Sequence, residues 1–199
     1  GRHHTFPMGT DLKTISDSIC PSVACKRAEG ETDVLAALVD NQLKELSFKA
    51  LTTHTVRFIG YDHPDGRRTY IRSLCFVLQN VIREMYPDKV LVIDYSLPSG
   101  LYCEIREKEE LFDGRPKVYF ATDEEIEKIQ DRMNEIILAD LPFKKTKQTL
   151  EDAVKLFDSN GQKEKVNLAR SLGRMTYSVY FLDGQADTFH GPLTPSTGY

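Results

Sequence analysis

The sequence has no hydrophobic run long enough to cross a membrane, because no apolar stretch approaches the roughly 20 residues that a transmembrane helix needs. The first residues, Gly1 to His4, also lack the apolar core of a signal peptide. We therefore expect a cytoplasmic protein that makes no membrane contact.

Cysteine is scarce as well, with four in 199 residues. Cys20 and Cys25 are spaced too widely for a C-x-x-C motif, and Cys75 and Cys103 lie in apolar segments, where free thiols are commonly buried. The sequence predicts neither a disulfide nor a zinc site, and we expect no cofactor in this chain.

An excess of positive charge is missing too. The net charge is -4 and the isoelectric point is about 5.8, and basic residues are dispersed except at Arg67-Arg68 and within residues 144–147. Counterion release at a basic face drives binding to nucleic acid, so this composition supports RNA binding only weakly. A local basic groove stays open as an alternative.

No phosphate-binding loop of the form G-x-x-x-x-G-K-[ST] occurs in the sequence. Gly161-Gln162-Lys163 comes nearest to it, but it lacks both the upstream glycine and the Ser or Thr. Residues 1–199 therefore cannot phosphorylate a substrate by themselves.

Hydrophobic residues make up 40% of the chain and aromatic residues 10%, which is enough to build one large or two small cores. The stretch from Asp62 to Gly66 combines a proline with an Asp-Gly pair, a composition that favours a turn. We place a domain boundary there, between residues 1–62 and 63–199.

Residues 1–62 are predicted to form a small module of strands with one short helix, whose apolar side carries Leu12, Ile15 and Ile19. The expected elements are a strand at 4–6, a helix capped by Thr10 or Asp11, and strands at 34–39, 43–51 and 56–59. This order resembles a TGS domain, the β-grasp (ubiquitin-like) module at the head of threonyl-tRNA synthetases. Such a domain opens with a hairpin, and we expect this chain to begin at what would be its second strand.

Residues 63–199 are predicted to form a larger α+β domain. Its clearest signal is a capping box of Thr122 and Glu125, which opens a helix with Ile126, Ile129, Met133 and Ile136 or Ile137 inward. The other expected elements are helices at 69–85, 150–158 (capped by Thr149) and 163–171, strands at 89–95, 101–106, 117–120, 143–148 and 174–182, and a short strand after the turn at 183–184.

Three segments of this second part resemble the editing domain of threonyl-tRNA synthetases, namely residues 70–78, Tyr86-Pro87 and residues 99–102. In that family a helix carries His-x-x-x-His, with both side chains on one face, and a C-terminal loop carries Cys-x-Gly-Pro-His. The four matching positions here are Arg72, Phe76, Phe189 and Leu193. None of these side chains offers a lone pair to a metal ion, so the resemblance implies a retained scaffold without catalytic or metal-binding residues.

The same resemblance implies five candidate ligand-binding residues, namely Arg72, Tyr102, Lys165, Asp187 and His190. A lysine can stabilise negative charge and an aspartate can orient a polar ligand or water. The plainer interpretation, which we favour, is a surface lysine, an aspartate in a β-turn and an ordinary loop histidine. Arg72 is either a solvent-facing helix residue or a buried guanidinium that could hold phosphate or carboxylate.

Two outcomes for this pocket follow from the residues. If Arg72 points into a cleft bounded by Tyr102, Lys165, Asp187 and His190, two cations lie beside one carboxylate, and the cleft would accept a small anionic ligand such as a nucleotide phosphate. Collapse of Phe76, Phe189 and Leu193 onto one another would instead fill the pocket. We favour collapse, because three of the four replaced positions are large and apolar.

Residues 67–78 and 193–199 also resemble bacterial uridine or nucleoside kinases that carry a TGS domain and a synthetase-like domain ahead of a P-loop domain. This second resemblance implies a non-catalytic regulatory or ligand-binding region of an ATP-dependent transferase. Its partner would be a C-terminal P-loop kinase domain of the same polypeptide, with ATP and Mg bound only there. The alternatives are an editing-type hydrolase that removes a wrong amino acid from tRNA, and a tRNA- or RNA-binding module.

Overall fold

The computed structural model describes residues 2–19, 33–98, 100–110, 116–160 and 162–199. These residues form an α+β protein, as predicted from the sequence, and they separate into two compact units. The first unit combines Gly1–Leu74 with Asp140–Tyr199, and the second contains Cys75–Ala139. Helix α2 (Pro64–Met85) contributes to both units. The domain division at residue 62 stays a prediction.

The N-terminal part of the first unit packs helix α1 (Leu12–Ile19) against short antiparallel strands. Strands β2 (Ala36–Val39), β3 (Gln42–Lys44) and β5 (Val56–Ile59) form a sheet in the order β3-β2-β5, and β1 (Thr10–Asp11) pairs with β4 (Lys49–Ala50). Leu12 and Ile15 pack with Ala37, Val39 and Leu46 in a shared core, so the predicted apolar side of the helix is confirmed.

Two strand predictions in this part are wrong. Residues 4–6 form no strand, and the expected strand at 43–51 is broken into β3 and β4 by a turn. Cys20 and Cys25 lie outside the described residues.

Helix α2 starts at Pro64, five residues earlier than predicted. The predicted turn at residues 62–66 is therefore wrong from Pro64 onward, where the chain is helical. Proline suits the first helical position, because its missing N–H would have no partner there. Gly66 is required for a different reason, since a Cβ atom at this position would lie 1.8 Å from the carbonyl oxygen of Gly60. The Asp-Gly pair thus marks a close backbone approach inside the helix rather than a turn.

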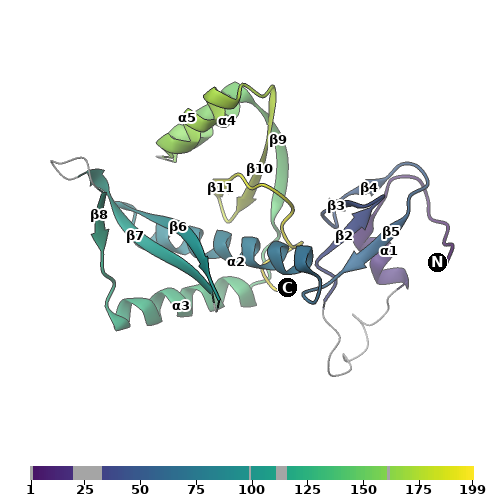
Figure 1. Cartoon of the computed structure of the whole chain (residues 1–199), viewed down its shortest axis with the longest axis horizontal. Helices are drawn as coiled ribbons and strands as arrows, with labels where there is room; N and C mark the ends of the chain where they lie inside the picture. The colour runs from purple at the N-terminus through teal and green to yellow at the C-terminus, as the bar shows by residue number, and fades with distance from the viewer. Residues whose placement is uncertain (1, 20–32, 99, 111–115, 161) are drawn as a thin grey trace. The chain divides into compact units, whose positions relative to one another are not determined.

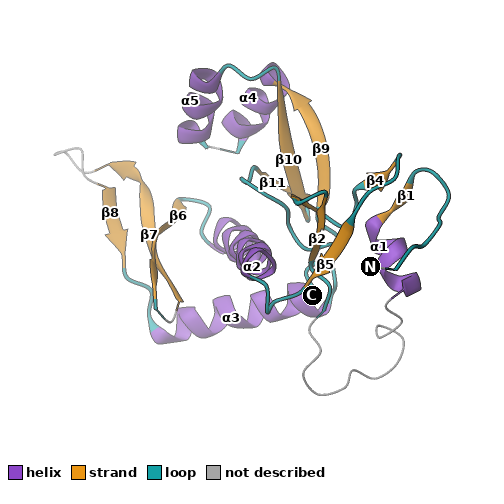
Figure 2. Ribbon diagram, turned by 45° about the vertical axis from the view of Figure 1, so that its right-hand side comes forward, coloured by secondary structure: helices purple, strands orange, loops and turns teal. Residues whose placement is uncertain are grey.

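The C-terminal part of the first unit is a sheet of order β11-β10-β9 with two helices (Figures 1 and 2). It comprises β9 (Lys144–Thr149), α4 (Leu150–Ser159), α5 (Lys163–Leu172), β10 (Thr176–Leu182) and β11 (Gln185–Asp187). Thr149 caps α4 as predicted, because its hydroxyl accepts a hydrogen bond from the Asp152 amide at 3.2 Å. The predicted turn at Asp183-Gly184 is also confirmed, with φ angles of 46° and 79°.

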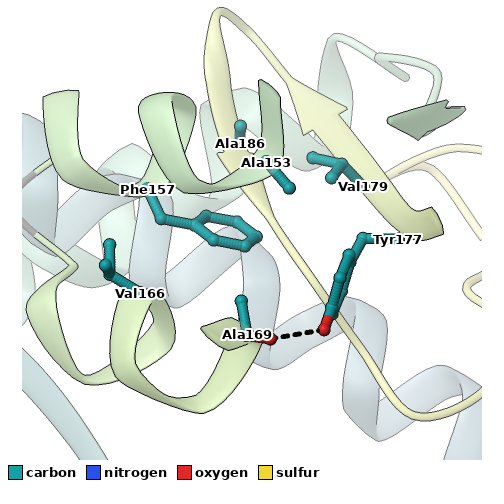
Figure 3. Close-up of a cluster of buried hydrophobic side chains, with 7 residues drawn as sticks. All are labelled: Ala153, Phe157, Val166, Ala169, Tyr177, Val179 and Ala186. Atoms are coloured by element: carbon teal, nitrogen blue, oxygen red, sulfur yellow. Dashed lines mark hydrogen bonds between the residues drawn. The ribbon is translucent and has the colours of Figure 1, made fainter. Parts of the chain in front are cut away.

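The core of this part lies between the two helices and strands β10 and β11 (Figure 3). Phe157 of α4 is 1% exposed and packs with Ala169 of α5 and Tyr177 of β10. The Tyr177 hydroxyl donates to the Ala169 carbonyl at 2.7 Å, so the ring is both packed and hydrogen-bonded. This core fixes the position of α5 relative to β10, and both elements line the site described below.

The second unit holds the end of α2, the antiparallel sheet β6-β7-β8 and helix α3 (Asp123–Leu138). Its strands are β6 (Lys89–Leu97), β7 (Gly100–Glu110) and β8 (Pro116–Tyr119). The Thr122–Glu125 capping box is confirmed, and Ile129 and Ile136 are buried as predicted. Ile126 is 52% exposed, so the prediction that it faces inward is wrong. Cys75 is partly buried and Cys103 is exposed, and both are free thiols.

In the part of the chain that the structure describes, no helix is both long and apolar enough to span a membrane.

Candidate functional site

Lys165 and Asp187 form an ion pair that joins helix α5 to the end of strand β11. Asp187 is completely buried, and its carboxylate also accepts a hydrogen bond from the Thr188 amide at 2.6 Å. The plainer interpretation of a surface lysine and an aspartate in a β-turn does not fit this geometry, because the aspartate is the last residue of a strand. A buried carboxylate needs such a cation and amide to offset its loss of hydration.

A cavity of about 290 Å³ lies beside this ion pair. Helix α5, strand β10 and the segment that follows β11 contribute its walls. The residues that line it are Phe157, Lys165, Leu168, Ala169, Leu172, Arg174, Thr176, Tyr177, Ser178, Thr188, Phe189, His190 and Gly191. Two of the predicted ligand-binding residues, Lys165 and His190, are therefore at one cavity.

The cavity forms where β10 has an unpaired edge. Strand β11 has three residues and pairs only with Tyr180–Leu182, so the first half of β10 extends beyond it. The Thr188 hydroxyl donates to the Ser178 carbonyl at 3.0 Å, which shows that the backbone of Ser178 faces this edge. Alternate residues of an antiparallel strand point their backbone groups to the same side, so the backbone of Thr176 faces the edge too.

Arg72 is partly buried and contacts the segment that follows β11. Its guanidinium Nη1 donates to the Pro192 carbonyl at 2.6 Å, and the group lies so close to Gly191 that a Cβ atom there would be 3.0 Å from the guanidinium carbon. Gly191 also has a φ of 125°, which favours glycine. Arg72 therefore binds the backbone of the loop that borders the cavity.

The other three positions that match metal ligands carry packed apolar side chains. Phe76 is 0% exposed and Leu193 is 2% exposed. The Phe189 ring lies 6.0 Å from the Tyr180 ring in an edge-on arrangement and lines the cavity. Within the described residues, no three His, Cys, Asp or Glu side chains gather in a way that could hold a metal ion.

Tyr102 belongs to the second unit and lies on β7. Its ring stacks on Tyr95 at a centroid distance of 4.8 Å, and its hydroxyl donates to Glu104 at 3.0 Å. This hydrogen bond to a carboxylate raises the pKa of the Tyr102 hydroxyl. The role of Tyr102 as a ligand-binding residue stays a prediction.

Sequence reasoning missed Arg174, Thr176 and Ser178, which line the cavity at the start of β10. A signal was present, because Thr176 and Ser178 alternate with the apolar Tyr177 and Val179, as polar and core faces of a strand do. It could not indicate a cavity, since the cavity depends on the early end of β11.

A second missed feature is the buried hydroxyl of Tyr180. It donates to the Glu45 carboxylate at 2.9 Å and to the Gly191 carbonyl at 3.4 Å. Burial, followed by the negative charge of Glu45, raises the pKa of Tyr180. Glu45 also pairs with Lys145 at 2.9 Å, so a carboxylate from the turn between β3 and β4 is bound by two residues of the C-terminal sheet.

A scan against protein-family models finds no match for this chain. Curated relatives do match it, and they are threonine-tRNA ligases. The chain is 27% identical over 199 residues to the threonine-tRNA ligase of Acetivibrio thermocellus, covering 100% of this chain and 29% of that protein. It is 24% identical over 195 residues to the enzyme of Carboxydothermus hydrogenoformans, covering 98% of this chain and 28% of that protein. The chain thus spans less than a third of the length of these relatives.

This similarity supports a domain like that of threonyl-tRNA synthetases and overturns the kinase prediction. The similarity to the ligases extends over nearly the whole chain, and none of it points to a uridine or nucleoside kinase or to transferase activity. The expected P-loop kinase domain as a covalent partner is wrong for the same reason. ATP and Mg were expected only in that domain. The absence of a cofactor in this chain stays a prediction.

Proposed function

We propose that this chain is a tRNA-related module of the editing type, which receives the 3′ end of a tRNA in the cavity beside Lys165 and Asp187 and does not hydrolyse it. In this proposal residues 1–62 are a TGS-like β-grasp domain and residues 63–199 are an editing-like domain. The observation that carries it is the ion pair of Lys165 with the buried Asp187 beside a cavity, in a chain similar to threonine-tRNA ligases over nearly its whole length.

The cavity has groups suited to a single-stranded RNA end. Thr176 and Ser178 offer hydroxyls for ribose, and the Phe189 ring offers an apolar face on which a base can stack. Lys165 is the cation nearest to the buried carboxylate and can donate to a ligand from the cavity side. Outside the cavity, exposed Lys144 and Lys147 on β9 supply local positive charge, although the net charge of the chain is -4.

Binding without hydrolysis follows from what occupies the four matching positions. Arg72 is engaged with the backbone of Pro192, and Phe76 and Leu193 are buried as packing residues. None of them can activate a water molecule, because a general base needs an accessible lone pair that can take a proton.

The proposal is tested by measuring the affinity of the chain for deacylated tRNA and for the same tRNA without its terminal adenosine. We expect the truncated tRNA to bind at least about tenfold more weakly, which corresponds to about 1.4 kcal/mol. Equal affinity for the two tRNAs would contradict binding of the 3′ end.

The variant Lys165→Met is compared with Lys155→Met, an exposed lysine on α4 that does not line the cavity. Lys165→Met leaves the buried Asp187 without its cation, so the double variant Lys165→Met/Asp187→Asn is measured as well, with thermal unfolding as a check of folding. We expect weaker tRNA binding in both Lys165 variants and none of this loss in Lys155→Met.

A hydrolase is the second candidate, because Lys165, which pairs with Asp187, and His190 line the same cavity. Incubation of the chain with misacylated tRNA distinguishes the two functions. Our proposal predicts that the aminoacyl bond survives at the rate seen without protein, and release of amino acid that depends on Lys165 would favour the hydrolase.

A further inference from the structure

The cavity wall carries positive charge without a neighbouring carboxylate to neutralise all of it. No Asp or Glu is among the thirteen residues that line it, while Lys165, Arg174 and His190 are. The charge of Lys165 is matched by Asp187. Arg174 therefore leaves an uncompensated positive charge at the cavity.

Four polar side chains at the cavity are unengaged. Within the described residues, no hydrogen bond or ion pair involves the side chains of Arg174, Thr176, Ser178 or His190, although each of these residues lines the cavity. Thr176 and Ser178 are two residues apart on β10, so their hydroxyls point to the same side of the strand. Two donors that can carry charge and two hydroxyl-bearing residues thus line the same cavity.

The part of the cavity wall that α5 forms is mostly apolar. Leu168 and Leu172 are 48% and 44% exposed, which is high for leucines on a helix that packs against a core. Together with the Phe189 ring they present an apolar surface that a flat ligand could cover. The cavity volume of about 290 Å³ is just below the about 300–1,000 Å³ of pockets that bind drug-sized ligands, so the ligand has the size of a small metabolite.

We propose that this cavity is a binding site for a small molecule that combines one phosphate or carboxylate group with a flat apolar body. Arg174 binds the anionic group with its planar donors, assisted by His190 and by the hydroxyls of Thr176 and Ser178. The apolar body lies against Leu168, Leu172 and Phe189. The unpaired edge of β10 contributes its backbone donors, since the backbone of Thr176 faces this side.

The inference differs from the prediction made from sequence, which assigned the anion to Arg72. Arg72 is not among the residues that line the cavity, whereas Arg174 is, so the cation that meets the ligand is Arg174. The inference also deepens the proposed function, since a small anion in this cavity would occupy the place of the RNA end and would compete with tRNA.

Calorimetry on the whole chain with four probes tests the inference. Phenyl phosphate and benzoate carry both features, benzyl alcohol carries the ring without charge, and inorganic phosphate carries the charge without a ring. We expect phenyl phosphate, benzoate or both to bind at least about tenfold more tightly than benzyl alcohol and inorganic phosphate. Tighter binding of phenyl phosphate identifies a phosphate ligand, and tighter binding of benzoate identifies a carboxylate ligand.

Arg174→Gln and Arg170→Gln form a matched pair of variants. Both arginines are exposed, and only Arg174 lines the cavity. We expect Arg174→Gln to weaken binding of the anionic probe at least about tenfold, and Arg170→Gln to leave it unchanged. Equal effects of the two variants, benzyl alcohol binding as tightly as the anions, or no binding of any probe at millimolar concentration would overturn the inference.

The tRNA measurement distinguishes a failure of this inference from a failure of the proposed function. Loss of probe binding in a chain that still distinguishes intact from truncated tRNA would overturn only the small-anion site. Probe binding that depends on Arg174 in a chain that does not bind tRNA would support the anion site and remove the RNA end as its occupant.

Discussion

Glu125 shows how one side chain can serve two structural purposes. Its carboxylate completes the capping box by accepting from the Thr122 amide at 2.8 Å, and it also accepts from the Tyr119 hydroxyl at 2.6 Å. The hydrogen bond from Tyr119, followed by the one from the Thr122 backbone, lowers the pKa of Glu125 to about 2. The same contact raises the pKa of Tyr119 to about 12.

This pKa predicts how Glu125→Gln changes stability with pH. Because the pKa of Glu125 is lower in the folded than in the unfolded chain, its carboxylate stabilises the fold above its usual titration range, and this contribution is lost as pH falls toward about 2. Urea unfolding should show the largest difference between wild type and variant at neutral pH and a shrinking difference in acid. Glu127→Gln, an exposed residue of the same helix, is the control. A difference that stays constant down to about pH 3 would contradict the assignment.

Gly66 provides a second test at the residue scale. Replacing glycine with alanine inside a helix normally stabilises it by about 1 kcal/mol. Here the new Cβ would lie 1.8 Å from the Gly60 oxygen, a backbone atom that cannot move alone. We therefore expect Gly66→Ala to lower the free energy of unfolding by about 1–3 kcal/mol, the usual range for overpacking. Chemical denaturation measures it, with Gly100→Ala, where a Cβ meets nothing within 4 Å, as the control.

At the scale of elements, the segment after β11 is bound to several distant parts of the chain. The Thr194 amide donates to the Ser73 hydroxyl of α2 at 2.9 Å, and the Thr197 amide donates to the Leu141 carbonyl at 2.9 Å. Lys13 of α1 donates to the Tyr199 hydroxyl at 2.8 Å. The cavity loop at 188–191 is therefore held at its C-terminal side by helix α2 and by the start of the C-terminal sheet region.

Replacement of Tyr180 tests how much a hydrogen bond between distant elements contributes to stability. It is buried and donates to the charged Glu45, and a hydrogen bond to a charged group contributes about 1.5–3 kcal/mol. We expect Tyr180→Phe to lower the free energy of unfolding by an amount in this range, measured by urea denaturation. Tyr61→Phe, an exposed tyrosine, should change it little. If the two variants were equally stable, the Tyr180–Glu45 hydrogen bond would not contribute to folding.

For the molecule as a whole, the expected metal content follows from the four positions that match zinc ligands. Arg72, Phe76, Phe189 and Leu193 provide no thiolate or imidazole, so we expect no stoichiometric zinc in the purified chain. Elemental analysis measures this directly. About one zinc per chain that survives mild chelation would contradict the prediction and would require ligands elsewhere in the sequence.

Local patterns predicted much of the fold, because their causes lie within a few residues. Thr122 and Glu125 satisfy each other's amides over three positions, and Thr149 caps its helix in the same way. The turn at Asp183-Gly184 needs only residues that tolerate a positive φ. The start of α2 was placed too late, since Pro64 can begin a helix and the need for Gly66 depends on Gly60, which lies outside the helix.

The sequence alone determined the α+β class and most helices and strands, since each depends on residue type or on short-range spacing. Only the tertiary structure decided where the candidate site residues lie and what they contact. Lys165 and Asp187 pair across 22 positions, and Arg72 binds a backbone 120 positions away. Arg174 lines a cavity at the part of β10 that lies beyond the short strand β11. Such contacts depend on where separate elements pack, and no local pattern encodes that position.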